Sequence, residues 1–260
     1  MASPSDMEKE LIKMFRENMG DALRSEEEKS DPFLLRWIRA RDHNLDKAEE
    51  MLKNSLQWRE TSGADKILTT PYDPWFATSF PYWVDGLDKT GHPVIEIPLG
   101  AWDVRRAMNP EREPQWEGQI CRFFEDILRM IRESNNDTNH KDWPNTLCNI
   151  IVDWKGYSYS QLIHWKALQN TLKMAATYEA HYPEILHKVY FINCPAIFPL
   201  FMALLKPIIA PKTLGKITCF SGEEEWGPAF RADIDQDQLG HLYGGRRIMT
   251  VGDDVYNYDT

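Results

Sequence analysis

The stretch Thr146-Leu-Cys-Asn-Ile-Ile-Val-Asp153 decides the fold, because the strand that it predicts is apolar on both faces. A second strand of this kind is predicted at Lys188 to Asn193, after a long helix from about Tyr159 to His181. Shorter strands are predicted at Val94 to Ile97 and at Ile217 to Phe220. Strands that are apolar on both faces and separated by helices indicate a largely parallel sheet with crossover helices. The predicted fold class is therefore α/β.

Two further helices are predicted between and after these strands. Apolar residues recur every three or four positions from Ile120 to Ile131, which is typical of a core helix, and a polar loop is expected from Ser134 to Asn145. The run Cys194 to Leu205 contains no charged residue and predicts a mostly apolar helix from about Ile197 to Ile209. A helix without a polar face is either buried in the core or forms a movable lid over an apolar cavity.

The N-terminal part predicts a small helical unit. One helix places the apolar residues of Leu34 to Ile38 on one face, and a second helix runs from Leu45 until Gly63 ends it. The chain is then rich in Pro and aromatic residues from Thr69 to Pro81, so a domain boundary is expected near Trp75. The expected division is a helical unit at 1–75, a principal domain at 76–245 and a tail without periodicity at 246–260.

Composition excludes some partners. The chain of 260 residues has 40 acidic and 30 basic side chains and a net charge of −10, which argues against nucleic acid as a partner. The stretch Met1 to Arg16 lacks the apolar core of a signal peptide, and the run Cys194 to Leu205 is shorter than the ~20 residues that span a bilayer. A cytoplasmic protein is expected.

We interpret its four widely spaced cysteines as free thiols: Cys121, Cys148, Cys194 and Cys219.

Catalytic motifs are absent from the sequence. It contains no G-x-G-x-x-G, G-x-x-x-x-G-K-[ST] or G-x-S-x-G, and its seven histidines form no H-E-x-x-H or Cys/His group. We therefore predict no enzyme, no metal and no cofactor. The residues open to an enzymatic alternative are Asp153, Tyr178 and Glu184. Asp153 with Gly156 is better interpreted as a cap followed by a turn, and the clusters Glu26–Glu28 and Glu223–Glu225 as solvated charge.

Several segments between residues 31 and 245 form a recognisable pattern together with the apolar run. They are Asp31-Pro-Phe-Leu-Leu-Arg-Trp-Ile-Arg-Ala-Arg41, Trp58-Arg59, Tyr182-Pro-Glu184, Val189-Tyr-Phe-Ile-Asn193, Pro195, Phe198, Lys206-Pro207, Thr213, Lys216 and Tyr243-Gly-Gly245. In order and spacing these segments resemble the CRAL-TRIO lipid-binding family. The pattern is most similar to the supernatant-protein-factor branch and its retinaldehyde-binding and tocopherol-transfer relatives. Members of that branch usually continue into a C-terminal β-sandwich, so a truncated or naturally short form is expected.

The resemblance implies a cavity that is floored by the sheet and closed by a gate helix around Phe198 to Ile209. It implies binding and transfer of one lipid at a time, without catalysis. The expected partners are a small hydrophobic lipid and, briefly, a membrane surface, while the sequence indicates no particular oligomeric state. The residues expected to meet the membrane are Phe201, Met202, Lys206 and Lys212.

The resemblance also suggests the ligand class. Phosphoinositide-binding members hold the head group at positions that match Arg41, Glu184, Thr213 and Lys216, although Glu184 and Lys216 also fit a structural ion pair. Two neighbouring basic positions of those members are Asp42 and Ile185 here, which weakens a phosphate site. A retinoid, a tocopherol or another isoprenoid, with Tyr178 as its hydrogen-bond partner, is therefore favoured. Phosphoinositide or phospholipid binding remains the alternative.

The predicted cavity wall consists of apolar side chains from the sheet and its covering helices. Its expected volume is about 300 to 1,000 Å³. The wall is expected to contain Phe124, Ile127, Cys148, Ile150, Val152, Leu172, Ala175, Tyr178, Ile192, Cys194, Phe198, Phe201, Met202, Leu205 and Ile208.

Overall fold

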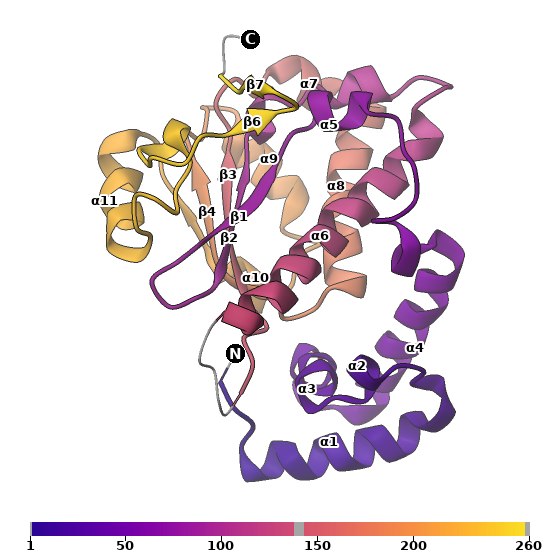
Figure 1. Cartoon of the computed structure of the whole chain (residues 1–260). Coiled ribbons are helices and arrows are strands. Elements are labelled where there is room, and N and C mark those ends of the chain that lie inside the picture. The colour runs from indigo at the N-terminus through magenta and orange to yellow at the C-terminus, as the bar shows by residue number, and fades with distance from the viewer. Residues whose placement is uncertain (1, 138–142, 258–260) are drawn as a thin grey trace.

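A five-stranded sheet forms the centre of the computed structural model, which describes residues 2–137 and 143–257 (Figure 1). The strands follow one another across the sheet in chain order, and the first is antiparallel while the others are parallel. The prediction of an α/β fold with a largely parallel sheet is therefore confirmed. The strands are β1 (Trp83–Leu87), β2 (Pro93–Ile97), β3 (Cys148–Asp153), β4 (Leu186–Ile192) and β5 (Ile217–Cys219).

The register of β3 and β4 decides which residues share a face. Ile150 lies opposite Val189, and Val152 lies opposite Phe191. These side chains belong to the core on one face of the sheet, whereas Ile151 belongs to a separate core on the other face. Both faces of the central strands are buried, as their apolar sequences predict.

Helices cover the two faces unequally. Figure 1 shows α6 (Trp116–Asp137) and α8 (Trp165–His181) on one side of the sheet and α11 (Glu223–Asp233) on the other. The short α9 (Phe198–Leu205) contacts α8 on the first side. The remaining short helices of the principal domain are α5 (Trp75–Ser79), α7 (Tyr159–Ile163) and α10 (Pro211–Leu214). Short 3₁₀ helices lie at Gly20–Ala22, Ala64–Lys66, Leu99–Ala101, Val104–Ala107, Glu113–Gln115 and His241–Tyr243.

The N-terminal part is a helical unit with its own core, as predicted. Gly63, at a φ of 69°, ends the last of its helices, and Phe15, Leu34 and Leu52 are buried together. Its first helix was not predicted, although Ser5 and Glu8 form a capping box at its start. The helices of this unit are α1 (Asp6–Met19), α2 (Glu26–Lys29), α3 (Asp31–Ala40) and α4 (Leu45–Ser62).

A buried ion pair fastens the N-terminal unit to the principal domain. Arg59 on α4 lies 2.8 Å from a carboxylate oxygen of Glu125 on α6, and the hydroxyl of Tyr182 donates to the same carboxylate at 2.9 Å. Glu125 is only 4% exposed. The Trp58 and His181 rings also stack across this junction, 3.9 Å apart. Removing either charged partner would leave the other charge without this ion pair, so we expect such a change to weaken the junction.

Three helix boundaries differ from the expected ones. The helix predicted from Tyr159 to His181 breaks at His164, whose backbone is extended and whose ring nitrogen accepts from the Ala167 N–H as a cap. The apolar helix ends at Leu205 and not near Ile209, since Pro207 follows shortly and cannot continue the hydrogen-bond ladder. Residues 134–137, expected in a loop, continue α6, while 138–142 of that loop lie outside the described residues.

The C-terminal segment packs against the second face of the sheet. Met249 is fully buried there, the Trp83 indole donates to the Thr250 carbonyl at 3.0 Å, and Tyr256 lies against Trp83. The segment forms a small hairpin of β6 (Thr250–Val251) and β7 (Asp254–Val255). Because each strand of this hairpin has only two residues, the segment shows no hydrophobic periodicity in the sequence.

Glu96 provides a test of this packing, because its carboxylate is fully buried between β2 and the C-terminal segment. It accepts from the Gly240 N–H at 2.7 Å and pairs with Arg247, which also meets Asp85. We predict that Glu96→Gln lowers the free energy of unfolding by about 3 kcal/mol, because Arg247 then lacks its buried partner.

Urea denaturation measures that loss. The matched control is Glu117→Gln, which removes an exposed partner of Lys173 and should change the free energy of unfolding by less than about 1 kcal/mol. Equal effects of the two substitutions would contradict the assigned role of Glu96.

Candidate functional site

A cavity of about 150 Å³ lies between the first face of the sheet and helices α6, α8 and α9. Its surface is almost wholly apolar. Each wall comes from a different part of the chain, so the fold and not any local motif creates the space. The lining residues are Ile97, Leu99, Phe123, Phe124, Ile150, Val152, Trp154, Thr171, Met174, Ala175, Tyr178, Leu186, Val189, Phe191, Phe201, Leu205, Ile209, Thr213 and Ile217.

The structure brings part of the predicted wall together. The predicted residues that line the cavity are Phe124, Ile150, Val152, Ala175, Tyr178, Phe201 and Leu205. Others lie in or against the surrounding core without lining the cavity: Ile127, Cys148, Leu172, Cys194, Phe198 and Met202. Ile208 is half-buried and also lies outside the lining.

Ile192 was wrongly predicted to line the cavity. It is buried in the core on the opposite face of the sheet, while its neighbour Phe191 lines the cavity instead. Side chains alternate along a strand, so a shift of one residue exchanges the two faces. Sequence reasoning missed Val189 and Phe191 because the pairing of β4 with Ile150 and Val152 on β3 was not known.

An aromatic cluster occupies the end of the cavity beneath α9. The Trp154 ring lies 5.0 Å from the Phe198 ring, 4.7 Å from the Phe201 ring and 5.6 Å from the Phe191 ring, between ring centres. These side chains fill space that the sheet and helices enclose. The cavity is therefore about half the smallest volume expected from the sequence.

Polar side chains gather at the other end. Thr213 and Tyr178 both line the cavity there. Beside them, the Glu184 carboxylate forms ion pairs with the ammonium groups of Lys212, at 2.7 Å, and Lys216, at 3.4 Å. Burial raises the pKa of Tyr178 well above its ordinary value, so its hydroxyl is a neutral hydrogen-bonding group at physiological pH.

Three of the four predicted head-group residues therefore lie together, namely Glu184, Thr213 and Lys216. Arg41 follows the end of α3, where its guanidinium donates to the Ala40 carbonyl. Among the described residues it makes no hydrogen bond or ion pair with the other three. The Lys212 ammonium does reach the neighbouring Arg39 carbonyl at 3.4 Å, which joins this cluster to the N-terminal unit.

Asp153 has a structural environment. It is 1% exposed, and its carboxylate accepts from the Lys155 N–H and from the Asn193 amide, each at 2.9 Å. Gly156 follows at a φ of 86°, in a turn. Asp153 ends β3, whereas Glu184 precedes the start of the parallel strand β4, so the two carboxylates lie at opposite ends of the sheet. They do not converge on one substrate.

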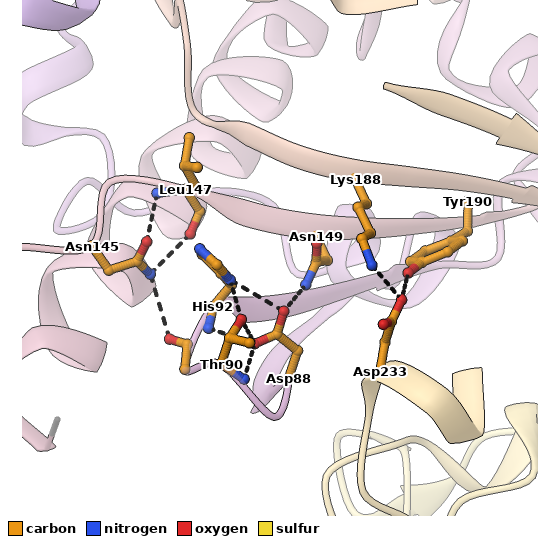
Figure 2. A network of polar contacts seen from close by, with 10 residues as sticks. Asp88, Thr90, His92, Asn145, Leu147, Asn149, Lys188, Tyr190 and Asp233 are labelled. Carbon is orange, nitrogen blue, oxygen red and sulfur yellow. Dashed lines mark hydrogen bonds and ion pairs between the residues drawn. The ribbon is translucent and has the colours of Figure 1, made fainter. Parts of the chain in front are cut away.

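A polar network at the start of the sheet contains the one group of described residues with metal-ligand chemistry, Asp88, His92 and His187, whose ligand atoms lie within 4.8 Å of one another. Figure 2 shows Asp88 already accepting from Thr90, His92 and Asn149. The two histidine rings stack nearly parallel, at 16°, so their in-plane lone pairs do not converge. This geometry fits a hydrogen-bonded turn better than a metal centre.

Two apolar surfaces are exposed near the cavity elements. Leu200 and Leu204 on α9 are 53% and 38% exposed, whereas Phe201 is only 3% exposed. A second group, on α7 and the start of α8, consists of Tyr159, Ile163 and Trp165, each more than 60% exposed. In the described part of the chain, no helix is both long and apolar enough to cross a membrane.

Several known proteins are similar to this chain. The protein real-time of Anopheles gambiae is 30% identical over 82% of this chain and 31% of its own length. The CRAL-TRIO domain-containing protein T23G5.2 of Caenorhabditis elegans is 30% identical over 85% of this chain and 30% of its own length. The chain thus spans less than a third of these relatives. The crystal structure of Sfh5 has the same fold, with a TM-score of 0.69 at 14% identity over 99% of this chain and 93% of that one.

Family matches cover most of the chain. Residues 6–54 match the CRAL/TRIO N-terminal domain, and residues 77–245 match the CRAL/TRIO domain. The second match contains every residue that lines the cavity. The chain therefore belongs to the CRAL/TRIO family of lipid-binding and lipid-transfer proteins.

Proposed function

We propose that the chain carries one small, mostly apolar lipid in the cavity and exchanges it at a membrane surface without catalysing a reaction. The observation that carries this proposal is the cavity itself, which is lined by apolar side chains from the sheet and from the short helix α9. Native mass spectrometry of the purified protein, followed by extraction, tests it. The expected result is one bound lipid per chain, and a changed lipid after incubation would favour an enzyme.

The size of the cavity supports α9 as the moving element. A volume of about 150 Å³ is too small for an isoprenoid lipid, since ligand cavities usually measure about 300 Å³ or more. Phe201 lines the cavity from α9, and Phe198 packs on Trp154 beside it. Outward displacement of α9 removes both rings, enlarges the space and opens it in one motion.

The polar groups of the wall suggest the polar part of the ligand. The buried Trp154 indole N–H has no hydrogen-bond partner among the described residues, although it belongs to the cavity lining. Tyr178 and Thr213 supply hydroxyls at the other end. A hydrocarbon with one oxygen group that accepts a hydrogen bond, such as a retinoid or a tocopherol, satisfies this donor.

Replacing Trp154 by Phe tests the proposed donor. The substitution keeps an aromatic ring but removes the N–H, so we predict a loss of about 0.5–1.5 kcal/mol, or roughly 2- to 10-fold weaker binding of retinal or α-tocopherol. Fluorescence titration measures the Kd. Trp116→Phe is the matched control, because its indole N–H is also buried, has no partner in the described part of the chain and lies outside the cavity. Equal affinity of the two variants would exclude a role for the Trp154 N–H.

Membrane contact is proposed through the exposed side of α9. The sequence predicts that Phe201 and Met202 meet the membrane, but Phe201 is buried and Met202 half-buried in the structure. Leu200 and Leu204 are the large apolar side chains of α9 that are exposed, and the exposed Lys206 follows them. A lysine near an anionic surface contributes about 1 kcal/mol of attraction. The ion pair of Lys212 with Glu184 makes it less available.

We predict that the double substitution Leu200→Asp and Leu204→Asp slows lipid transfer between vesicles at least about 10-fold, because two charges then oppose entry of α9 into the interface. A fluorescence dequenching assay measures the rate. Ile248→Asp, which changes an apolar residue that is 57% exposed outside α9, is the control and should leave the rate near that of the unchanged protein. Equal rates for all three proteins would remove α9 from the proposed exchange step.

A phosphoinositide ligand is the second candidate, because Thr213 lines the cavity next to Lys212 and Lys216. Glu184 offsets one of the two lysine charges, which favours the apolar ligand. We predict that Lys216→Glu reduces retinal binding less than 3-fold, whereas a phosphoinositide carrier would lose more than about 10-fold, through lost attraction and added repulsion. Paired titrations with retinal and with phosphoinositide-containing vesicles distinguish the two ligands.

A further inference from the structure

A second pocket, of about 320 Å³, lies at the junction between the N-terminal unit and the principal domain. Helices α2, α3 and α4 form one side of it, and Leu128 and Arg132 of α6 form the other. His181 at the end of α8 completes the lining. None of its lining residues belongs to the cavity described above.

Arg36 is the unusual member of this lining. It is 8% exposed, and among the described residues it makes neither an ion pair nor a hydrogen bond; its Nε is buried without a partner. Its guanidinium carbon lies over the Phe33 ring, 5.4 Å from the ring centre. Burial lowers the pKa of Arg36 to about 10, which still leaves it charged at neutral pH. A buried cation without a counter-ion is costly, so the pocket favours an anion.

The carboxylates around the pocket are already occupied. Glu27 pairs with Arg132 at 3.2 Å, and Asp65 pairs with Arg59 at 2.6 Å. Glu60 pairs with Arg24. The Glu28 carboxylate accepts hydrogen bonds from the backbone N–H groups of Arg24 and Ser25, just before α2. Each acidic side chain of the lining therefore has its own partner, and none pairs with Arg36.

Neighbouring groups add a donor and an apolar surface. Trp37, which is 2% exposed, lines the pocket and has an indole N–H with no partner among the described residues. Leu52, Leu56 and Leu128 supply apolar surface in the same pocket. A guanidinium, an indole N–H and apolar side chains together suit a compact ligand with an oxyanion at one end and a hydrocarbon body at the other.

We propose that this pocket binds a small organic oxyanion, a carboxylate or a phosphate monoester with a compact apolar body, through Arg36 and Trp37. The ligand would contact both the N-terminal unit and α6, and its site is separate from the proposed lipid cavity. The proposal does not depend on which lipid the cavity carries.

Benzoate and phenyl phosphate serve as probes, titrated into the full chain at constant ionic strength and followed by thermal unfolding and by calorimetry. We expect a saturable rise in Tm with at least one probe, and its identity distinguishes a carboxylate from a phosphate ligand. Arg36→Met should weaken binding at least 10-fold, and Trp37→Phe by a smaller factor. Arg106→Met, which removes an exposed arginine outside the pocket, should leave the Kd unchanged.

The stability of the variants without probe is a second readout. Because Arg36 lacks a counter-ion, we expect Arg36→Met to unfold at the same Tm as the unchanged chain or at a higher one. If that variant does not fold, Trp37→Phe decides the question. No saturable binding of either probe, or equal affinity in the pocket variants and in Arg106→Met, would overturn the proposal.

Discussion

The structure depends on the burial of β3 and β4 on both faces. Neither face of these strands offers polar side chains to water over most of its length, so each needs its own apolar cover. On one face the cover is α6, α8 and α9, and on the other it is α11 with the C-terminal segment. The second face is filled, even to the extent of enclosing Glu96 with hydrogen-bond partners. The cavity is therefore confined to the first face.

The proposed function requires α9 both to pack on the core and to move away from it. In the structure its rings pack on Trp154 and stabilise the core. In its proposed role as a gate, the same helix must leave that position. Its eight residues are too few to form a stable helix alone, so α9 persists through packing and loses its support when it moves into water. An apolar membrane interface would restore that support, which explains physically why such a gate would open at a membrane and stay closed in solution.

Sequence patterns predicted the elements better than the site. The apolar stretches of β3 and β4 and the stripe of α6 were sufficient for the fold, because burial on both faces restricts the possible sheets. The choice between Phe191 and Ile192 depended on strand register, which is a tertiary property. Arg36 shows a similar limit. It lies beside the apolar face of its helix and looks solvent-exposed in sequence, but in the fold it is buried at the pocket that α3 and α4 form with α6.

The junction with the N-terminal unit also determines which cavity wall is fixed. The Phe124 ring, which lines the cavity, stacks on Tyr182 at 4.7 Å, and Tyr182 donates to the same Glu125 that holds Arg59. The wall of α6 and α8 is thus fastened by buried charges to a second, separately packed core. In contrast, α9 rests on ring contacts, and the segment after it is tied to α8 by a bond from the Ala210 N–H to Glu179 at 3.2 Å. Ring contacts re-form at an apolar interface, whereas a buried ion pair cannot be broken without stranding a charge. The cavity should therefore open on the side of α9, with the N-terminal unit remaining in place.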